Sequence, residues 1–152
     1  MTERLNYIET VPAAFRALYA LQTQVRKSSL DEMLEHLVYL RVSQINGCGY
    51  CVDMHDKDLR AGGETAERLA MVAVWQEAHN FTQRERAAFA WAEAVTRLGP
   101  HALPDALYEA TRAEFGDVGL VDLTLAISTI NAWNRMNLAF QTPPGKYQPT
   151  AK

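Results

Sequence analysis

The chain has 152 residues, of which 48% are hydrophobic and 22% charged, and its formal net charge is −3 at pH 7. This length suits one globular domain, and the composition is that of a soluble protein rather than a disordered one. Because the basic side chains form no stripe along the sequence, nucleic acid is not expected as a partner.

The sequence offers no apolar segment long enough to cross a membrane. Its first ten residues, MTERLNYIET, lack the apolar run of a secretory signal. The longest uncharged apolar candidate, the 12 residues between Asp122 and Arg135, is shorter than the roughly 20 residues that a spanning helix needs. We therefore expect a cytoplasmic protein without a membrane partner. In that reducing compartment two cysteines do not form a structural framework.

The dominant periodicity is helical from the start of the chain. A first helix is expected from Pro12, a favourable first-turn residue, through PAAFRALYALQTQVRKSS. The next is expected to begin at Ser28 or Ser29, because Glu32 lies three residues after Ser29 at the spacing of a capping box. It should end at Asn46-Gly47, where the turn chemistry stops a helix.

Helical patterns continue beyond this turn. The further expected helices are Cys48–Arg60, 65–78, 82–99 (with Thr82 and Glu85 at the capping-box spacing), 104–116 and 118–141. No strand-like alternation competes with them, so the predicted fold class is all-α, in one domain. Its core should span about residues 12–141, and the prolines of the tail at 142–152 favour an extended conformation there.

A weak internal echo joins two of these helices. VSQING at 42–47 and ISTINA at 127–132 share Ser, Ile and Asn at a constant offset of 85 residues. Either two helices of similar packing face each other across the core, or the identities are chance.

The two cysteines of the chain lie in one short motif, CGYC, with a histidine four residues after the second. On a helix that begins near Cys48, the side chains of Cys48, Cys51 and His55 share one face. The imidazole of His55 can then contact the Cys51 thiol directly or through one water. Cys48 lies near the helix N-terminus, where free amides favour an anion. Both effects lower a thiol pKa, which indicates a reactive pair.

Three interpretations of the motif compete. The cysteines could simply be buried core residues, but that explains their spacing poorly. A zinc or iron site would need a fourth ligand beside Cys48, Cys51 and His55, drawn from His36, His79 or His101, and the second paired motif of most structural zinc sites is absent. Thiol–disulfide chemistry is favoured, although not in a thioredoxin fold, because no strand precedes the pair.

Residues 37–64, LVYLRVSQINGCGYCVDMHDKDLRAGGE, resemble the core motif of the alkylhydroperoxidase AhpD-like proteins of the carboxymuconolactone decarboxylase superfamily. The distal segment LVDLTLAISTINAWNRMNLAF is similar to the last helix of that family's shorter members. The resemblance implies an all-α domain that assembles as trimers or hexamers and carries a peroxide-reducing dithiol.

The resemblance also implies roles for the residues of the motif. Cys51 would attack the peroxide, Cys48 would resolve the product, and His55 would belong to a proton relay. The family's relay usually includes a glutamate twelve residues before the first cysteine, but that position is His36 here. Glu35 is adjacent but turned by about 100° on a helix. His36 can accept a proton at neutral pH, or it can serve only in packing.

Other polar residues around the motif receive less specific predictions. Asp56 and Asp58 are expected on the solvated face of their helix, and Tyr50 either faces a pocket or covers it. Asn131 and Asn134 are polar positions in an apolar run, for which satisfied core amides are the common outcome.

The predicted function is that of a CxxC-dependent peroxidase or thiol–disulfide oxidoreductase. Its partners would be a small hydroperoxide substrate and an external dithiol reductant, and it would need no cofactor and no metal. Two alternatives remain open: a lyase of the carboxymuconolactone decarboxylase type, acting on a small lactone acid, and a non-enzymatic, oligomeric redox-sensing module.

Overall fold

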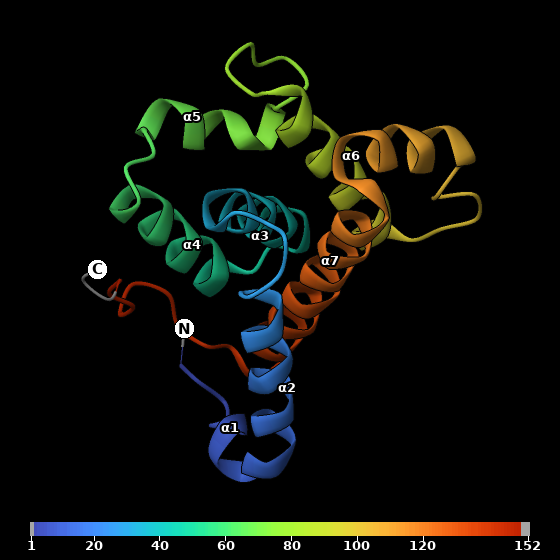
Figure 1. Cartoon of the computed structure of the whole chain (residues 1–152). Coiled ribbons are helices and arrows are strands. Elements are labelled where there is room, and N and C mark those ends of the chain that lie inside the picture. The colour runs from blue at the N-terminus through green and yellow to red at the C-terminus, as the bar shows by residue number, and fades with distance from the viewer. Residues whose placement is uncertain (1, 150–152) are drawn as a thin grey trace.

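A computed structural model of the chain describes residues 2–149. Every regular element within this range is helical, which confirms the predicted all-α class (Figure 1). The elements are α1 (Tyr7–Thr10), α2 (Pro12–Val25), α3 (Glu32–Asn46), α4 (Gly49–Ala61), α5 (Ala66–Met71), the 3₁₀ turn η1 (Val72–Val74), α6 (Gln83–Arg97) and α7 (Asp105–Phe140).

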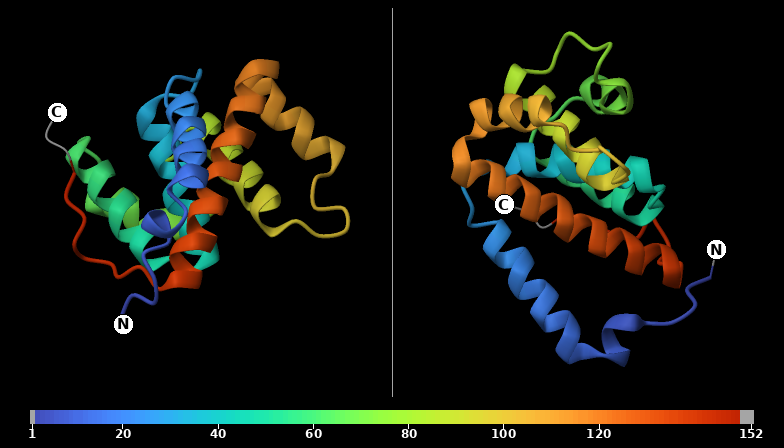
Figure 2. Two further views of the ribbon diagram at one scale, coloured as in Figure 1. Left: turned by 90° about the horizontal axis from the view of Figure 1, so that it is seen from below. Right: turned by 90° about the vertical axis from the view of Figure 1, so that its right-hand side faces the viewer.

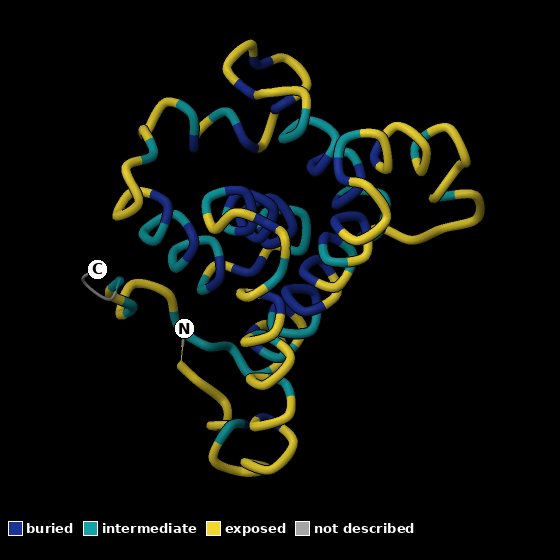
Figure 3. The backbone as a smooth tube through the Cα atoms, viewed as in Figure 1, coloured by how far each residue is buried: buried dark blue, intermediate teal, exposed yellow. Residues whose placement is uncertain are grey.

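Helix α3 is the centre of the molecule. It packs against α4, α6 and α7, and most of its residues from Leu34 to Ser43 are buried. A helix that is enclosed on several sides needs apolar residues around most of its circumference, and LVYL with the following Val42 supply them. The tube view shows this enclosure, with the buried segments gathered on α3 and on the facing sides of α6 and α7 (Figure 3).

Two apolar clusters lie on opposite sides of α3. One joins α3 to α6 and α7 and includes Val38, Trp91 and Ile127. The other lies under α4 and α5 and includes Leu37 and Leu59. Between α3 and α6, the buried Arg41 binds Glu93, with its Nη2 atom 2.7 Å from Oε1.

The start of α3 differs from the prediction. Its N-cap is Asp31, whose carboxylate accepts a hydrogen bond from the backbone N–H of Leu34 at 3.0 Å. Ser29 instead donates its hydroxyl to Asp122 of α7 at 2.7 Å. Aspartate caps a helix as well as serine does. The hydroxyl of Ser29 binds Asp122 of α7 and so does not cap α3. The capping box of Thr82 and Glu85 at the start of α6 is present as predicted.

The end of α3 follows the prediction and sets the position of α4. Gly47 adopts a left-handed conformation with φ of 71°, which glycine accepts without steric cost. The chain therefore reverses within three residues and α4 returns along α3 (Figure 1). At this corner Asn46 donates to Asn131 of α7 at 2.9 Å. The two asparagines of the sequence echo are thus in direct contact.

Helix α7 contains the break expected between residues 116 and 118. Gly116 has φ of 68° and ψ of 177° inside an otherwise helical run of 36 residues. This backbone region is open almost only to glycine. The segment before it turns away from the long distal part, which crosses the whole molecule (Figure 2).

Both ends of the described chain return to the same side of the molecule. After α7 the tail folds back over α4, where Lys57 donates to the carbonyl of Tyr147 at 3.0 Å and Asp53 accepts from the amide of Gly145 at 3.0 Å. The described part of the tail has no regular structure, and residues 150–152 lie outside the described range. None of the helices in residues 2–149 has the length and apolar character that a bilayer crossing requires.

Candidate functional site: a dithiol beside a histidine-lined cavity

The cysteine pair occupies the first turn of α4. Cys48 is the N-cap residue, and its sulfur accepts a hydrogen bond from the backbone N–H of Cys51 at 3.4 Å. The two residues form a disulfide, with Cα atoms 5.4 Å apart. Both are buried, at 1% exposure each. The close approach of the two sulfurs is therefore built into the start of the helix.

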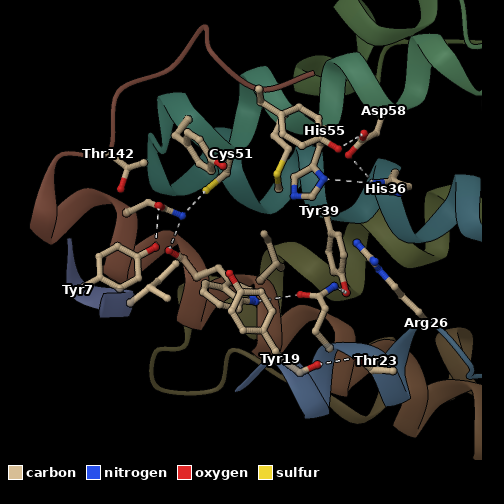
Figure 4. A pocket seen from close by; sticks show the side chains of 18 of the residues that line it. Tyr7, Tyr19, Thr23, Arg26, His36, Tyr39, Cys51, His55, Asp58 and Thr142 are labelled. Carbon is tan, nitrogen blue, oxygen red and sulfur yellow. Dashed lines mark hydrogen bonds and ion pairs between the residues drawn. The ribbon is translucent and has the colours of Figure 1, made fainter. Parts of the chain in front are cut away.

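Only one of the two cysteines faces open space. A cavity of about 290 Å³ lies between α2, α3, α4, α7 and the two chain ends, and Cys51 is among its lining residues while Cys48 is not. Its walls are rich in aromatic side chains: Tyr7, Tyr19, Tyr39, Tyr50, Trp133 and Tyr147. The close-up shows Cys51 and His55 projecting from the same helix toward this space (Figure 4). A molecule in the cavity would meet Cys51 first.

The structure brings the two predicted histidines together. His55 lies one turn after Cys51 on α4, and its Nδ1 atom is 3.2 Å from Nδ1 of His36 on α3 (Figure 4). Both side chains line the cavity. Since one Nδ1 must donate and the other accept, a single proton lies between the two rings. His36 thus occupies a place where it can exchange a proton with His55.

His55 is the more deeply buried of the pair, with 3% of its surface exposed. Burial, followed by repulsion from Arg26 and from His36 when His36 is protonated, lowers the pKa of His55 well below its usual range. The ring is therefore neutral at pH 7. Its second nitrogen, Nε2, is buried without a hydrogen-bond partner among the described residues. An orphaned polar atom of this kind calls for an explanation, and a thiol or thiolate in the reduced protein would supply one.

Asn137 is a site residue that the sequence analysis missed. Its Nδ2 atom donates to the sulfur of Cys51 at 3.4 Å, and its Oδ1 accepts from the hydroxyl of Tyr7 at 3.0 Å. The signal was available, because Asn137 follows Asn131 and Asn134 at steps of three along one helix. The other two hold the α3–α7 corner: Asn134 donates to Ser43 at 3.0 Å and accepts from Asn46 at 2.9 Å.

Asp58 was predicted on the solvated face of α4, and that prediction is wrong. Asp58 lines the cavity, and its Oδ2 atom is 3.8 Å from Nδ1 of His36. Its Oδ1 accepts a hydrogen bond of 2.6 Å from the hydroxyl of Tyr147 in the tail. Asp56, by contrast, pairs with the exposed Arg60. Asp58 follows His55 by three residues and Cys51 by seven, so helical spacing alone places it on their face.

Glu35 does not take the place of the family's glutamate. It is buried at 3% exposure and does not line the cavity. Burial raises the pKa of its carboxyl, against the opposing effect of a hydrogen bond with Tyr39. The rotation of about 100° between Glu35 and His36 on α3 therefore turns Glu35 away from the cavity, as the sequence predicts.

The cysteines do not form the metal site considered above. Among residues 2–149, the group of side chains that could share an ion is His36, His55 and Asp58, and it includes neither cysteine, nor His79, nor His101. The contact between the two Nδ1 atoms has the geometry of a hydrogen bond.

An all-helical fold in which a CxxC pair opens a helix beside a histidine-lined cavity defines the AhpD-like class. The chain belongs to the carboxymuconolactone decarboxylase family, whose model matches residues 12–94. It is 34% identical to the uncharacterized protein YdfG of Bacillus subtilis (strain 168) over 139 residues, which cover 91% of this chain and 95% of YdfG.

Solved structures agree with this assignment. ATU0492 from Agrobacterium tumefaciens, a protein of unknown function for which an antioxidant defence role as AhpD has been suggested, superposes with a TM-score of 0.91 at 39% identity, covering 96% of this chain and all of that one. A peroxidase-related protein with an alkylhydroperoxidase AhpD core, from Ralstonia eutropha JMP134, gives a TM-score of 0.81 at 25% identity, covering 91% of this chain and 74% of that one.

Proposed function

We propose that the protein is a CxxC-dependent hydroperoxidase, in which Cys51 attacks the peroxide and Cys48 resolves the product. The observation that carries this proposal is the division between the two sulfurs. Cys51 lines the cavity beside two histidines, whereas Cys48 is buried behind it within bonding distance of Cys51. A substrate-facing thiol and a hidden partner thiol are what a two-step dithiol reaction needs.

The first step uses the thiolate of Cys51. His55 removes the thiol proton, and Asn137 stabilises the resulting anion by the hydrogen bond that it donates to this sulfur. The thiolate attacks one oxygen of ROOH, the O–O bond breaks, and RO⁻ leaves as ROH after taking up a proton. Cys51 becomes a sulfenic acid.

The second step uses Cys48. Its thiol sulfur attacks the sulfenic sulfur of Cys51, water leaves, and the disulfide forms. An external dithiol then reduces that disulfide by exchange and is itself oxidised. Each turnover reduces one hydroperoxide and oxidises one dithiol, and no bound cofactor takes part. We propose trimers or hexamers as the working assembly, by analogy with the AhpD-like class.

The experiment is hydroperoxide consumption by the reduced protein, with dithiothreitol as the dithiol and an organic hydroperoxide as the substrate. We expect Cys51→Ser to fall to the background rate and Cys48→Ser to lose sustained turnover. His55→Ala should be slow, while His79→Ala, a change at an exposed loop position, should match the unmodified protein. Full turnover by Cys51→Ser would end the proposal. Decarboxylation of a lactone acid that survived loss of both cysteines would instead support the lyase.

A further inference from the structure

Position 36 carries a histidine where the family's relay usually has a glutamate, but a carboxylate from another helix lies beside that histidine. Asp58 reaches the cavity from α4 and approaches Nδ1 of His36 to 3.8 Å, the same nitrogen that contacts His55 (Figure 4). The carboxylate and His36 are largely buried, with 16% and 12% of their side-chain surfaces exposed. An ion pair in such a partly dry setting is stronger than one at the surface.

We propose that Asp58 is the terminal carboxylate of the proton relay, a positioning residue that stabilises the proton that His36 receives when Cys51 is deprotonated. This inference rests on the proposed function in that the substrate is a hydroperoxide. The proton transfer from Cys51 does not depend on that substrate. The route runs Cys51, His55, His36, with Asp58 beside the last ring.

The proton transfer balances along this route. The Cys51 thiol gives its proton to Nε2 of His55, and His55 passes the proton on its Nδ1 to Nδ1 of His36. The products are a thiolate, a neutral His55 with a proton on Nε2, and an imidazolium on His36 next to the Asp58 carboxylate. When RO⁻ leaves, the same steps run in reverse and return one proton to it.

The environment of His55 explains why the charge should come to rest on His36. His55 is buried, and its pKa is lowered first by that burial. His55 can therefore pass a proton on, but its doubly protonated, charged form is disfavoured. His36 has Asp58 as a counter-charge. The buried Nε2 of His55, which has no partner in the disulfide form, becomes a donor to the Cys51 thiolate after reduction.

The tail fixes the carboxylate. The hydroxyl of Tyr147 donates to Asp58 at 2.6 Å, and Lys57 holds the tail backbone at Gly145 and Tyr147. One oxygen of Asp58 is thereby committed to Tyr147, which leaves the other directed at His36. Tyr147 thus acts on the relay through Asp58, without contact with either cysteine.

Of the carboxylates that line the cavity in residues 2–149, Asp58 is the one that pairs with His36. Glu3, the other carboxylate that lines the cavity, lies exposed in the N-terminal segment. Glu35 is sequestered against Tyr39 on α3, and Arg26 at the end of α2 is a cation. The tyrosines that line the cavity are Tyr7, Tyr19, Tyr39, Tyr50 and Tyr147.

The test measures the pH profile of Cys51 alkylation by iodoacetamide in a Cys48→Ser background, where one thiol remains. With Asp58 present we expect the midpoint below the ordinary thiol value of about 8.5. An opposite charge at this range shifts a pKa by about one unit or more, so Asp58→Asn should slow alkylation at pH 7 about tenfold and move the midpoint upward. Asp58→Glu should recover part of the rate, and Tyr147→Phe should shift the midpoint by less in the same direction.

The matched control is Asp56→Asn, two residues away on the same helix and paired with the exposed Arg60. It should leave the profile unchanged. An Asp58→Asn profile that coincides with that of Asp56→Asn would overturn the proposal. If Asp58→Asn loses the helical circular dichroism signal, an unshifted Tyr147→Phe profile would overturn it. Alkylation involves no peroxide, so this test is independent of the proposed function. If the protein does not consume hydroperoxides but Asp58→Asn still shifts the alkylation midpoint, the relay is supported and the proposed function is wrong.

Discussion

Asn137 of α7 donates a hydrogen bond to the sulfur of Cys51 on α4 at 3.4 Å. The last helix of the chain thereby contributes a donor to the dithiol, whereas His36, His55 and Asp58 come from α3 and α4. Because Asn137 is buried and its oxygen is held by Tyr7, its N–H group is oriented toward the sulfur before any thiolate forms. An oriented donor of this kind stabilises the anion more than the neutral thiol.

We predict that Asn137→Ala raises the pKa of the Cys51 thiol and slows its reaction with hydroperoxide. Hydrogen bonds to charged groups contribute about 1.5–3 kcal/mol, and sulfur is a weak acceptor, so we expect a loss of about tenfold at pH 7. Stopped-flow measurement of single-turnover oxidation would check this. Tyr7→Phe removes only the group that orients Asn137 and should have a smaller effect. Equal rates for Asn137→Ala and the unmodified protein would show that this contact has no kinetic role.

The largely buried ion pair between α3 and α6 should stabilise the fold. Arg41, at 8% exposure, binds Glu93, which also accepts from Nε1 of Trp75 at 2.8 Å. Removing one partner of a buried pair costs about 3–5 kcal/mol, so we expect Glu93→Gln to lower the free energy of unfolding by about 3 kcal/mol at pH 7. Urea denaturation measures this directly. Asp56→Asn, at an exposed pair, should cost less than about 0.5 kcal/mol.

The same carboxylate predicts a pH dependence. Burial alone would raise the pKa of Glu93, but hydrogen bonds from Trp75 and Arg41 outweigh it and hold this pKa below its usual value. A group whose pKa is lowered on folding stabilises the protein above the unfolded value of about 4.3, and that contribution disappears as the pH falls through the folded value. The stability difference between the unmodified protein and Glu93→Gln should therefore shrink below pH 4. A constant difference from pH 7 to pH 3 would contradict this account.

The break in α7 should depend on the backbone freedom of Gly116. A Cβ added there would meet nothing within 4 Å, yet φ is 68° and ψ is 177°. A non-glycine residue in this region costs about 1–3 kcal/mol, so Gly116→Ala should lower the free energy of unfolding by about that amount. Gly99→Ala is the matched control, because it also meets nothing within 4 Å and its φ is not positive. Similar unfolding curves for the two variants would exclude strain at Gly116.

The sequence was sufficient for most of the helices and for the central hairpin. Several helix ends depend on local chemistry that the sequence shows directly. The structure contains those marked by Pro12, by Asn46-Gly47 and by the Thr82–Glu85 capping box. The start of α3 was misplaced because two neighbouring side chains, Ser29 and Asp31, were both suitable caps. The four-residue helix α1 has too few residues for any periodicity to show.

The site was only partly predictable, for two reasons. Cys51, His55 and Asp58 share a helix face by spacing alone, so Asp58 was within reach of the same argument that joined the other two. The contacts of Tyr7 and Tyr147 depend instead on how the two chain ends pack around α4 and α7. Such long-range packing leaves no periodic trace in the sequence.

The central claim is that Cys51 is the sulfur that peroxide oxidises. One measurement tests it most directly: reduced Cys48→Ser protein receives one equivalent of organic hydroperoxide in the presence of dimedone, and the adduct is located by mass spectrometry of the peptides. We expect one dimedone adduct per chain, on Cys51, because the resolving sulfur is absent and the sulfenic acid persists. An unmodified Cys51, in protein that still consumes the hydroperoxide, would contradict the account.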